Sequence, residues 1–404
     1  MGVKKVKKKI FIYHYSMELG GIERSLIGLL KKIDYSKFEV DLLLLKQEGE
    51  LLSQIPKEVN ISSCPVGEML GIPIVEALKK GKISVGLIRL YASLKIRILK
   101  KIFKSKKISS EQIGQILYKK VAKYMDKIET IYDLAIGFSW PHYYILNNIK
   151  AKKKIGWVHT DYSKIFPNIK EDRKMWEKLD MIACVSEECK NTFLEVFPEA
   201  EIKTIVIENI LDQKYLKKMS LQKVDDQSFT SDMFTKKILS VGRFCEAKNF
   251  DNVPSICREI LNQGEDIVWY LIGFGPDEAL IREKIHQEGM EEKVIILGKK
   301  ENPYPYMKAC DLYVQPSRFE GKAVTVREAQ MLGKPVVITN FESAKSQVED
   351  GVDGIIVPMD VESCAKEIVR VLQDKKLCER LSETCRNRDY SNGGEIDKIY
   401  RLMK

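Results

Sequence analysis

The sequence contains no long hydrophobic run. A helix that crosses a bilayer needs about 20 consecutive apolar residues, and no stretch approaches that length. At the N-terminus a basic segment precedes a short apolar run, Ile10 to Tyr13, without the small-residue cleavage site of a signal peptide. Val6 stands where a myristoylation signal has Ser or Thr. From these absences we predict a cytoplasmic protein without a membrane span.

Paired cysteines and metal-binding motifs are also missing. The nine cysteines are odd in number and include no C-x-x-C pair, whereas disulfide frameworks and zinc ribbons show paired spacing. We therefore expect reduced, mostly buried thiols. No His/Cys cluster and no Asp-x-Asp pair of the kind that chelates a metal–diphosphate complex is present, so no metal site is predicted. The absence of a Walker lysine loop disfavours hydrolysis of a nucleoside triphosphate.

Positive charge is concentrated in one window. The chain carries a net charge of +10, and fifteen basic residues face only two acidic ones between Lys79 and Lys127. Apolar residues recur there at helical spacing between Leu87 and Ile102, which predicts a helix with one apolar stripe and a basic remainder. Such a helix suits an anionic membrane surface, although an ordinary solvated surface helix has the same pattern. Nucleic-acid binding is disfavoured because stacking aromatics are few. The candidate membrane or acceptor contacts are Lys95, Arg97, Lys100, Lys101 and Lys104.

Short β-rich runs alternate with helical patterns along the whole chain. Several are continuous apolar runs, as expected for parallel strands that are covered on both faces, and the alternation implies βαβ units. Twelve such strands are too many for a single sheet with one compact core. We therefore predict two Rossmann-like, doubly wound parallel-sheet domains of the α/β class, facing across a cleft. The predicted strands are Ile10–Tyr13, Val40–Leu45, Leu134–Phe138, Ile155–Val158, Met181–Val185, Ile202–Ile207, Ile238–Val241, Ile267–Ile272, Val294–Leu297, Leu312–Gln315, Val336–Ile338 and Ile355–Val357.

A polar stretch separates the two sets of strands. The predicted organisation is an N-terminal domain over residues 1–212 with a basic insertion at about 79–127, a linker over 213–236, and a C-terminal domain over 237–387. Ligands of doubly wound sheets bind at the carboxyl ends of the strands. We therefore expect the ligands of two such domains to bind in the cleft between them.

The strongest constellation is SRFEGKAVTVREAQMLGKPVV, residues 317–337. Glu320 precedes a small-residue turn and Glu328 lies about two helical turns later. The first-turn amides of Ala323, Val324 and Thr325 lack intrahelical partners, so the helix entrance suits an anion. Each carboxylate accepts hydrogen bonds, which suits sugar hydroxyls. Spacing alone also fits two solvated helix charges.

Two cations follow a predicted strand in SVGRFCEAKNF. Arg243 and Lys248 lie at the carboxyl end of that strand and suit a diphosphate, Arg as a bidentate partner and Lys as a point charge. Plain surface solvation is the alternative. The next strand leads into LIGFGP, where Gly273 opens a G-x-G-P turn that lacks the third glycine of a dinucleotide fingerprint.

The first half offers two weaker candidates. Gly20 and Gly21 lie between a strand and a helix, where a ligand's phosphate or sugar can approach the backbone closely, although a plain tight turn has the same sequence. His159 follows a strand in KKIGWVHTDY. A single histidine of this kind also fits a structural role.

These motifs, in this order, resemble the family-4 retaining glycosyltransferases of the GT-B type, which assemble bacterial surface polysaccharides. The resemblance extends over nearly the whole chain. It rests on GGIERSLIGLL (20–30), WVHTDY (157–162), VSEECKNTF (185–193), VIENILD (206–212), VGRFCEAKNF (241–250), IGFGP (272–276), the segment NPYPYMKACDLYVQPSRFEGKAVTVREAQMLGKPVV (302–337) and DGIIVP (353–358).

The resemblance implies that the first domain binds the acceptor and the second the donor, with Gly273 among the donor-binding residues. It also implies roles for other residues. Arg243 and Lys248 would bind the donor's diphosphate and Glu328 its ribose. Glu320 would contact the transferred sugar, with the amides of residues 323–325 beside it. His159 would face the reacting sugar, and Gly21 would lie against the phosphate. Main-chain groups near Gly298 would read the base, and residues 388–404 would form a helix that returns to the first domain.

The implied activity is retaining transfer of a hexosyl or related sugar from a nucleotide diphosphate sugar to a lipid-linked or oligosaccharide acceptor. Capsule, exopolysaccharide, lipopolysaccharide and teichoic-acid-type pathways all fit, with no metal or other cofactor required and a peripheral position on the inner face of the plasma membrane. A catalytically silent sugar-nucleotide-binding or scaffold protein on the same fold is the alternative. The chain departs from the family at Asn249, where Gly is common, at Glu208, where Pro is usual, and at Lys322 and Ala323.

Overall fold

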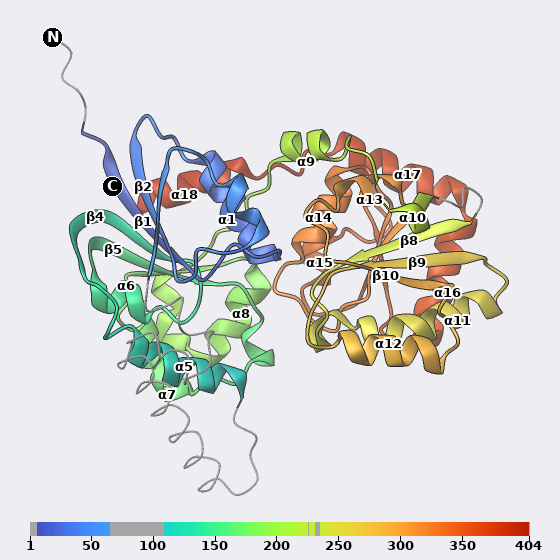
Figure 1. Cartoon of the computed structure of the whole chain (residues 1–404), viewed down its shortest axis with the longest axis horizontal. Helices are drawn as coiled ribbons and strands as arrows, with labels where there is room; N and C mark the ends of the chain where they lie inside the picture. The colour runs from blue at the N-terminus through green and yellow to red at the C-terminus, as the bar shows by residue number, and fades with distance from the viewer. Residues whose placement is uncertain (1–5, 65–108, 225, 231–234, 404) are drawn as a thin grey trace, which may run out of the picture. The chain divides into compact units, whose positions relative to one another are not determined.

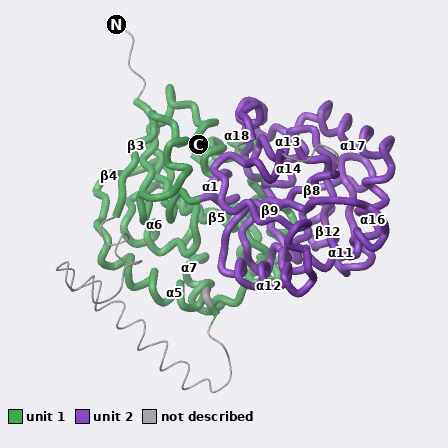
Figure 2. Tube along the Cα trace, turned by 45° about the vertical axis from the view of Figure 1, so that its right-hand side comes forward, with its two compact units in different colours: residues 1–18, 26–208, 394–404 green, residues 19–25, 209–393 purple. Residues whose placement is uncertain are grey.

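The chain folds into two compact units, each built around a parallel sheet. The structure is a computed structural model that describes residues 6–64, 109–224, 226–230 and 235–403. Unit 1 comprises residues 1–18, 26–208 and 394–404, and unit 2 comprises residues 19–25 and 209–393 (Figure 2). The first turn of helix α1 (Gly21–Lys32) therefore belongs to unit 2, although the rest of that helix belongs to unit 1.

Unit 1 contains a seven-stranded sheet in the order β3-β2-β1-β4-β5-β6-β7, in which all neighbouring strands are parallel. Ile10 to Tyr13 of strand β1 are all buried, as a strand with helices on both faces of its sheet requires (Figure 1). The strands are β1 (Lys8–His14), β2 (Phe38–Leu44), β3 (Val59–Ser63), β4 (Ile128–Gly137), β5 (Ile149–Val158), β6 (Met181–Cys184) and β7 (Thr204–Val206). The helices wholly within unit 1 are α5 (Ser110–Val121), α6 (Tyr143–Asn148), α7 (Ile169–Trp176), α8 (Glu187–Val196) and α18 (Ile396–Leu402).

The C-terminal helix α18 packs on the sheet of unit 1. Tyr400 stacks on Phe38 of β2 with ring centroids 4.5 Å apart, and its hydroxyl accepts a hydrogen bond from the Asp34 amide at 2.9 Å. Lys8 of β1 donates to the Met403 carbonyl at 2.7 Å. The last residues of the chain therefore cover strands formed by the first.

Unit 2 contains a six-stranded parallel sheet in the order β10-β9-β8-β11-β12-β13. Every residue of two strands, β11 and β12, is buried. The strands are β8 (Lys236–Val241), β9 (Ile267–Ile272), β10 (Val294–Gly298), β11 (Leu312–Gln315), β12 (Val336–Thr339) and β13 (Ile355–Val357). The helices are α9 (Gln213–Met219), α10 (Gln227–Thr230), α11 (Val253–Asn262), α12 (Glu278–Gln287), α13 (Tyr304–Ala309), α14 (Val324–Met331), α15 (Ala344–Gln347), α16 (Val361–Gln373) and α17 (Lys375–Asn387).

The two sheets confirm the predicted pair of parallel α/β domains. Each of the twelve predicted strands overlaps an observed one, and β3 is the strand among the described residues that the sequence did not predict. The segment expected as a linker over 213–236 differs: it contains α9 and α10, and Leu216 and Phe229 are buried in the core of unit 2. The segment is mostly polar in sequence, but its apolar residues lie on the buried faces of these helices. The segment is therefore part of unit 2.

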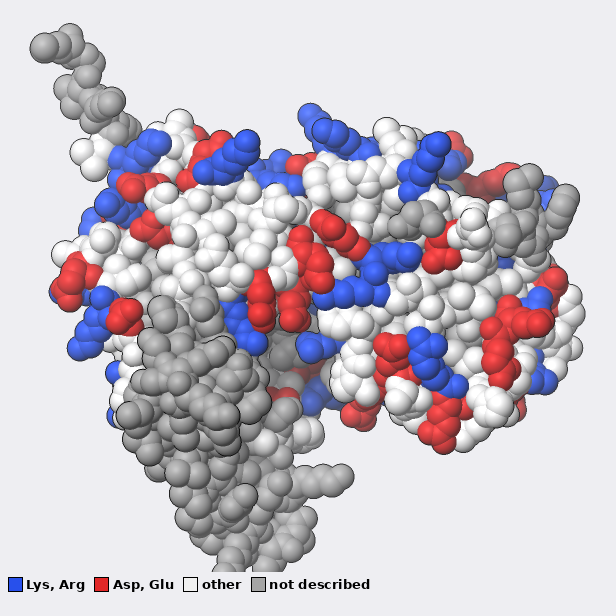
Figure 3. All heavy atoms as spheres, in the orientation of Figure 1, with Lys and Arg blue, Asp and Glu red and all other residues white. Residues whose placement is uncertain are grey.

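Most of the basic window lies outside the described residues. This holds for the helix expected between Leu87 and Ile102 and for Lys95, Arg97, Lys100, Lys101 and Lys104. Of that window the structure describes α5 and the turn after it. On the face shown in Figure 3, acidic and basic side chains of the described residues are interspersed. No helix among the described residues is long and apolar enough to span a bilayer.

Candidate functional site

The strand order of unit 2 marks a point where ligands of such sheets bind. Successive strands run outward in one direction from β8 and in the other from β11, and these two strands are neighbours. In open parallel sheets the loops after two such strands diverge, and ligands bind at the carboxyl ends beside them. The loop after β8 carries Arg243 and Lys248, and the loop after β11 carries Glu320.

The loop after β8 turns sharply so that Lys248 is held in place. Lys248 ends a short 3₁₀ turn, and Asn249 closes it with a left-handed backbone, φ 60°. Asn tolerates this conformation better than most residues other than Gly, which explains how this chain keeps the turn where its relatives commonly have Gly. Arg243 is exposed, and among the described residues it has no hydrogen-bond or ion-pair partner.

Lys248 and Glu320 form an ion pair across the two loops. The Lys248 ammonium contacts Glu320 Oε1, and the two side chains are only 18% and 10% exposed. Ser317 also donates to Glu320 Oε1 at 2.7 Å, Gln315 donates to Ser317 at 2.9 Å, and Tyr313 donates to Gln315 at 2.9 Å. This buried chain of hydrogen bonds fixes the carboxylate in one orientation.

A second ion pair joins the same two loops. Arg318 binds both carboxylate oxygens of Asp251, at 2.9 and 2.7 Å, and donates to the Glu246 carbonyl at 2.8 Å. The Asp251 carboxylate raises the pKa of Arg318. A bidentate pair restricts geometry more than a single contact does. Arg318 therefore fastens the loop that carries Glu320 to the loop that carries Lys248.

The entrance of α14 offers backbone donors beside Glu320. Its N-cap residue is Ala323, which has no side-chain oxygen, and no side chain caps the helix. The Thr325 amide therefore lacks the partner that Ser or Asp commonly supplies from the N-cap position, and the Val324 amide before it has no intrahelical acceptor. Uncapped amides together with the helix dipole favour an anion.

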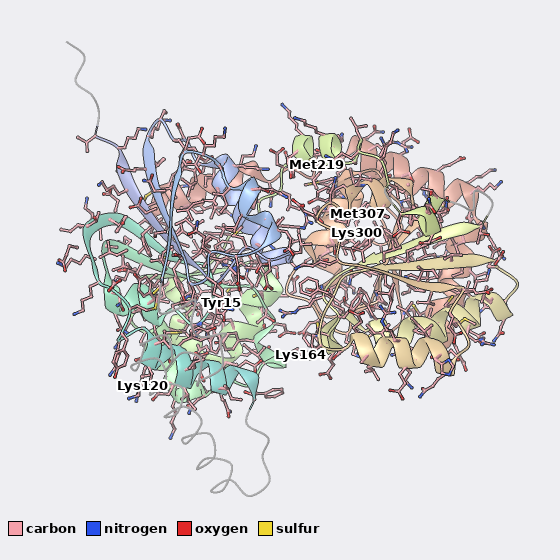
Figure 4. The ribbon with its side chains drawn as sticks, in the orientation of Figure 1. Tyr15, Lys120, Lys164, Met219, Lys300 and Met307 are labelled. Carbon is pink, nitrogen blue, oxygen red and sulfur yellow. The ribbon has the colours of Figure 1, made fainter. Side chains whose placement is uncertain are left out.

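Glu328 lies one helical turn further along α14 and is buried, with 1% of its surface exposed. Tyr304 of α13 donates to Glu328 Oε1 at 2.8 Å, and Arg24 donates to the same tyrosine hydroxyl. Glu328 Oε2 has no hydrogen-bond partner among the described residues. Burial outweighs Arg24 and Tyr304, so the pKa of Glu328 is raised. Met307 of α13 belongs to the same apolar cluster of unit 2 as Tyr304, and Met219 at the end of α9 packs against that cluster; both methionines are labelled in Figure 4.

The glycines of the site differ in role. A methyl group built on Gly273 would lie 1.9 Å from the Gly242 carbonyl oxygen, so Gly273 allows the loop after β9 to pack on the loop after β8. Gly273, which the sequence suggested as a donor-binding residue, therefore also has a structural role. Gly298 has a left-handed φ of 70° and accepts a hydrogen bond from the Gly273 amide at 2.9 Å. A methyl group on Gly21 would lie 3.7 Å from Val324 Cγ2, next to the entrance of α14.

His159 lies at the carboxyl end of β5 in unit 1, far along the chain from the residues above. Its Nε2 lies 3.0 Å from the Phe138 carbonyl, an acceptor, so Nε2 carries the proton. Burial and the neighbouring His14 lower the pKa of His159 to about 3. The ring is therefore neutral near pH 7, and Nδ1 is free to accept a hydrogen bond.

Unit 1 brings two further polar residues to the same edge of its sheet. His14 ends β1, and its Nδ1 lies 2.6 Å from Ser139 Oγ in the turn after β4. Its isolated position in the sequence gave no signal for this pairing, which only the adjacency of β1 and β4 creates. The segment after His159 is anchored by Tyr162, whose hydroxyl donates to the buried Asp172 and accepts from Trp176 at 3.1 Å.

Unit 2 therefore brings together Lys248, Glu320 and the α14 entrance, while Glu328 is buried behind them on the same helix. Sequence reasoning missed Arg24, Tyr304 and Arg318. All three stood within motifs that the resemblance already used, and this placement was the only signal available. Among the described residues, no group of three or more His, Cys, Asp or Glu side chains is arranged to hold a metal ion.

Comparison with known proteins shows which family and which proteins the chain is similar to. Residues 222–388 match the family described as "Glycosyl transferases group 1". The chain is 28% identical to the alpha-D-kanosaminyltransferase of Streptomyces kanamyceticus over 36% of its own length and 39% of that protein, so the match spans about two fifths of the relative.

Two further similarities extend over the whole chain. An N-acetylgalactosamine-N,N'-diacetylbacillosaminyl-diphospho-undecaprenol 4-alpha-N-acetylgalactosaminyltransferase of Campylobacter jejuni is 25% identical over 97% of this chain and 96% of its own. The crystal structure of Anabaena Alr3699/HepE in complex with UDP and glucose superposes with a TM-score of 0.68 and 17% identity, covering 98% of this chain and 99% of the other. This likeness confirms the predicted GT-B fold class.

The raised pKa of Glu328 predicts a pH-dependent effect of Glu328→Gln. The folded chain holds a proton at this carboxyl more tightly than the unfolded chain, whose ordinary value is 4.5. The stability gained from that proton is fully present below about pH 4.5 and is lost as the pH rises through the folded pKa. Gln does not ionise, so the variant should gain stability relative to the native chain between about pH 5 and about pH 8.

Urea unfolding at about pH 5 and at about pH 8 measures the gain in the free energy of unfolding. Glu292→Gln, at an exposed position in the turn after α12, is the matched control and should show no change with pH. An equal stability difference for Glu328→Gln at both pH values would contradict the raised pKa.

Proposed function

We propose that this chain, whose residues 222–388 form a glycosyl transferases group 1 domain, moves a hexosyl or related sugar from a nucleotide diphosphate sugar to an acceptor. The observation that carries the proposal is the meeting of Lys248, Glu320 and the uncapped α14 entrance at the switch point of the second sheet. Such a site presents cations and amides to a diphosphate and a carboxylate to sugar hydroxyls.

The diphosphate side of the site stabilises the leaving group. As the glycosidic bond breaks, negative charge grows on the phosphate oxygen that departs and positive charge grows on the sugar carbon. Arg243, Lys248 and the amides of Val324 and Thr325 supply preorganised donors for the negative charge. Each donor of this kind contributes about 3–4 kcal/mol to stabilising a transition state.

The carboxylates hold hydroxyls of the donor. Glu320 is oriented by Ser317 and Lys248, so it suits the transferred sugar, and buried Glu328 suits the ribose. Gly20 and Gly21 leave the backbone open to the donor's phosphate. From unit 1 we assign His159, whose neutral Nδ1 accepts a hydrogen bond from a hydroxyl of the reacting sugar.

We further propose that the reaction retains the anomeric configuration, as in family 4. No side chain of the described site is placed as a nucleophile. The acceptor therefore attacks the sugar carbon from the same face from which the leaving group departs. The leaving phosphate then takes the acceptor's proton. Because cations and amides already serve the departing charge, the proposed reaction requires no metal.

The acceptor is proposed to be lipid-linked or an oligosaccharide. The name of the Campylobacter relative specifies a diphospho-undecaprenol-linked acceptor, and that of the Anabaena structure specifies bound UDP and glucose. A lipid-linked acceptor requires the enzyme to work at a membrane surface, which suits the basic window between Lys79 and Lys127. We therefore place the chain in the cytoplasm at the inner face of the plasma membrane, in surface-polysaccharide assembly.

The diphosphate role predicts a large loss of turnover in Arg243→Ala and in Lys248→Met. Each substitution removes one charged donor to the leaving group, so kcat should fall by about 10²–10³. Initial rates of nucleotide release and of sugar transfer measure the effect, with Arg282→Ala on the exposed face of α12 as the matched control. Near-native transfer by either variant would remove that residue from the proposed role.

Retention predicts the stereochemistry of the product. With an α-linked donor, proton NMR of the new glycoside should show an α-configured anomeric proton. A β-configured product would exclude attack from the leaving-group face. Nucleotide release without transfer to any acceptor would favour a binding or scaffold protein.

The membrane assignment predicts binding to anionic vesicles. The full chain should float with vesicles that contain about 30% phosphatidylglycerol and remain behind with pure phosphatidylcholine. Replacing Lys95, Arg97, Lys100, Lys101 and Lys104 by Gln should weaken flotation by about 1 kcal/mol for each charge that lies near the headgroups. Equal flotation of the substituted and native chains would contradict this assignment.

A further inference from the structure

Arg24 has no role in the proposed function, although two glycines of its motif do. In GGIERS the glycines serve the donor, whereas the charged residues after them have no assigned role. The structure places residues 19–25 in unit 2. Ser25 donates to Asn209 Oδ1 at 2.6 Å, which anchors this turn within the same unit.

The Arg24 side chain packs on Tyr304. Its guanidinium carbon lies 5.0 Å from the centroid of the tyrosine ring, Nη1 donates to the tyrosine hydroxyl, and Nη2 donates to the Glu301 carbonyl at 3.2 Å. The same hydroxyl donates to Glu328 Oε1 at 2.8 Å. Arg24 therefore acts on Glu328 through one shared hydroxyl, although Arg24 and Tyr304 lie 280 positions apart in the sequence.

One of the two Glu328 carboxylate oxygens has a hydrogen-bond partner and the other has none among the described residues. Tyr304 occupies Oε1, whereas Oε2 is buried without a hydrogen-bond partner among the described residues. A buried carboxylate oxygen without a donor costs about 1–3 kcal/mol or more, and a ligand hydroxyl would remove that cost. Tyr304 and Arg24 thus hold one oxygen so that the other is presented in a fixed direction.

We propose that Arg24 and Tyr304 are positioning residues that hold Glu328 as a charged, oriented acceptor for the ribose hydroxyls of the donor. The proposal rests on the proposed function, because it takes the ribose as the ligand of Glu328. Tyr304 acts directly on the carboxylate, and Arg24 fixes Tyr304 and supplies a compensating positive charge.

The electrostatics of the cluster support this assignment. Arg24 and Tyr304 act on Glu328, and Tyr215 of α9 acts on both of these partners. Arg24 and the Tyr304 hydrogen bond both lower the pKa of Glu328 against the larger effect of burial. Removing either partner should therefore raise that pKa further and leave less of the carboxylate ionised at neutral pH.

The test measures how strongly each variant recognises ribose. Calorimetry with uridine, guanosine, adenosine and cytidine diphosphates first identifies the tightest binder of the native chain. Its 2′,3′-dideoxy form then serves as the probe without ribose hydroxyls. Hydrogen bonds to a charged group contribute about 1.5–3 kcal/mol, so the native chain should prefer the ribose form by about 10- to 150-fold.

Arg24→Met, Tyr304→Phe and Glu328→Gln should each reduce this preference to about threefold or less at pH 7. In Arg24→Met and Tyr304→Phe, but not in Glu328→Gln, the preference should return as the pH rises, because the carboxylate ionises again. A structural role without control of ionisation would not produce this recovery. Arg282→Met is the control and should keep the native preference at every pH.

The outcomes separate the inference from the proposed function. If no nucleoside diphosphate binds the native chain, the proposed function fails. If the native chain prefers ribose and Arg24→Met and Tyr304→Phe keep the full preference at every pH, the positioning role is wrong while the proposed function stands. Tyr304→Phe keeps the aromatic ring beneath Arg24, so it carries the test even if Arg24→Met folds poorly.

Discussion

The direction of the strands is the constraint on which the candidate site depends. In a parallel sheet every strand ends at the same edge, and in unit 2 the connections leave that edge in opposite directions after β8 and β11. This arrangement brings Lys248 and Glu320, 72 positions apart in the sequence, into contact. The buried hydrogen bonds beneath Glu320 and the Arg318–Asp251 pair then hold the two loops in register.

Two glutamates on the same stretch of chain experience opposite environments. Glu320 is paired with a cation and accepts a hydrogen bond from Ser317, so both partners orient it. Glu328 is buried, and its two supports only partly offset the loss of water, so its pKa is raised. The first carboxylate is already paired, whereas the second keeps one buried oxygen, Oε2, without a partner among the described residues. A ligand that donates hydroxyls gains more from the second.

The sequence was sufficient for the fold class and for most strands because fully buried strands appear as apolar runs. It was insufficient for β3, an edge strand with a single buried residue, Val59. It was also insufficient for α9 and α10, since Leu216 and Phe229 lie among polar neighbours in a segment that reads as a linker. Short-range spacing identified Arg243, Lys248, Glu320 and Glu328 as candidates, and their roles stay predictions.

Contacts between distant parts of the chain were beyond reach of the same reasoning. Nothing local marks Tyr304 as the partner of Arg24, or Ser139 as the partner of His14, because each pair is created by the packing of elements. The left-handed Asn249 shows the converse case. There a residue that looked like a departure from the family preserves the turn, since Asn and Gly share the conformation that the turn requires.

The ion pair between Lys248 and Glu320 also has a consequence for turnover. In the proposed reaction, a phosphate oxygen that captures Lys248 deprives Glu320 of its countercharge, and breaking a half-buried pair on one side alone is costly. An intact donor supplies new partners for both residues, because its sugar hydroxyls bind the carboxylate while its phosphates bind the ammonium. The nucleotide diphosphate product supplies a partner only for Lys248. Under this proposal the ion pair would compete with the bound nucleotide for Lys248 and would displace product more readily than substrate.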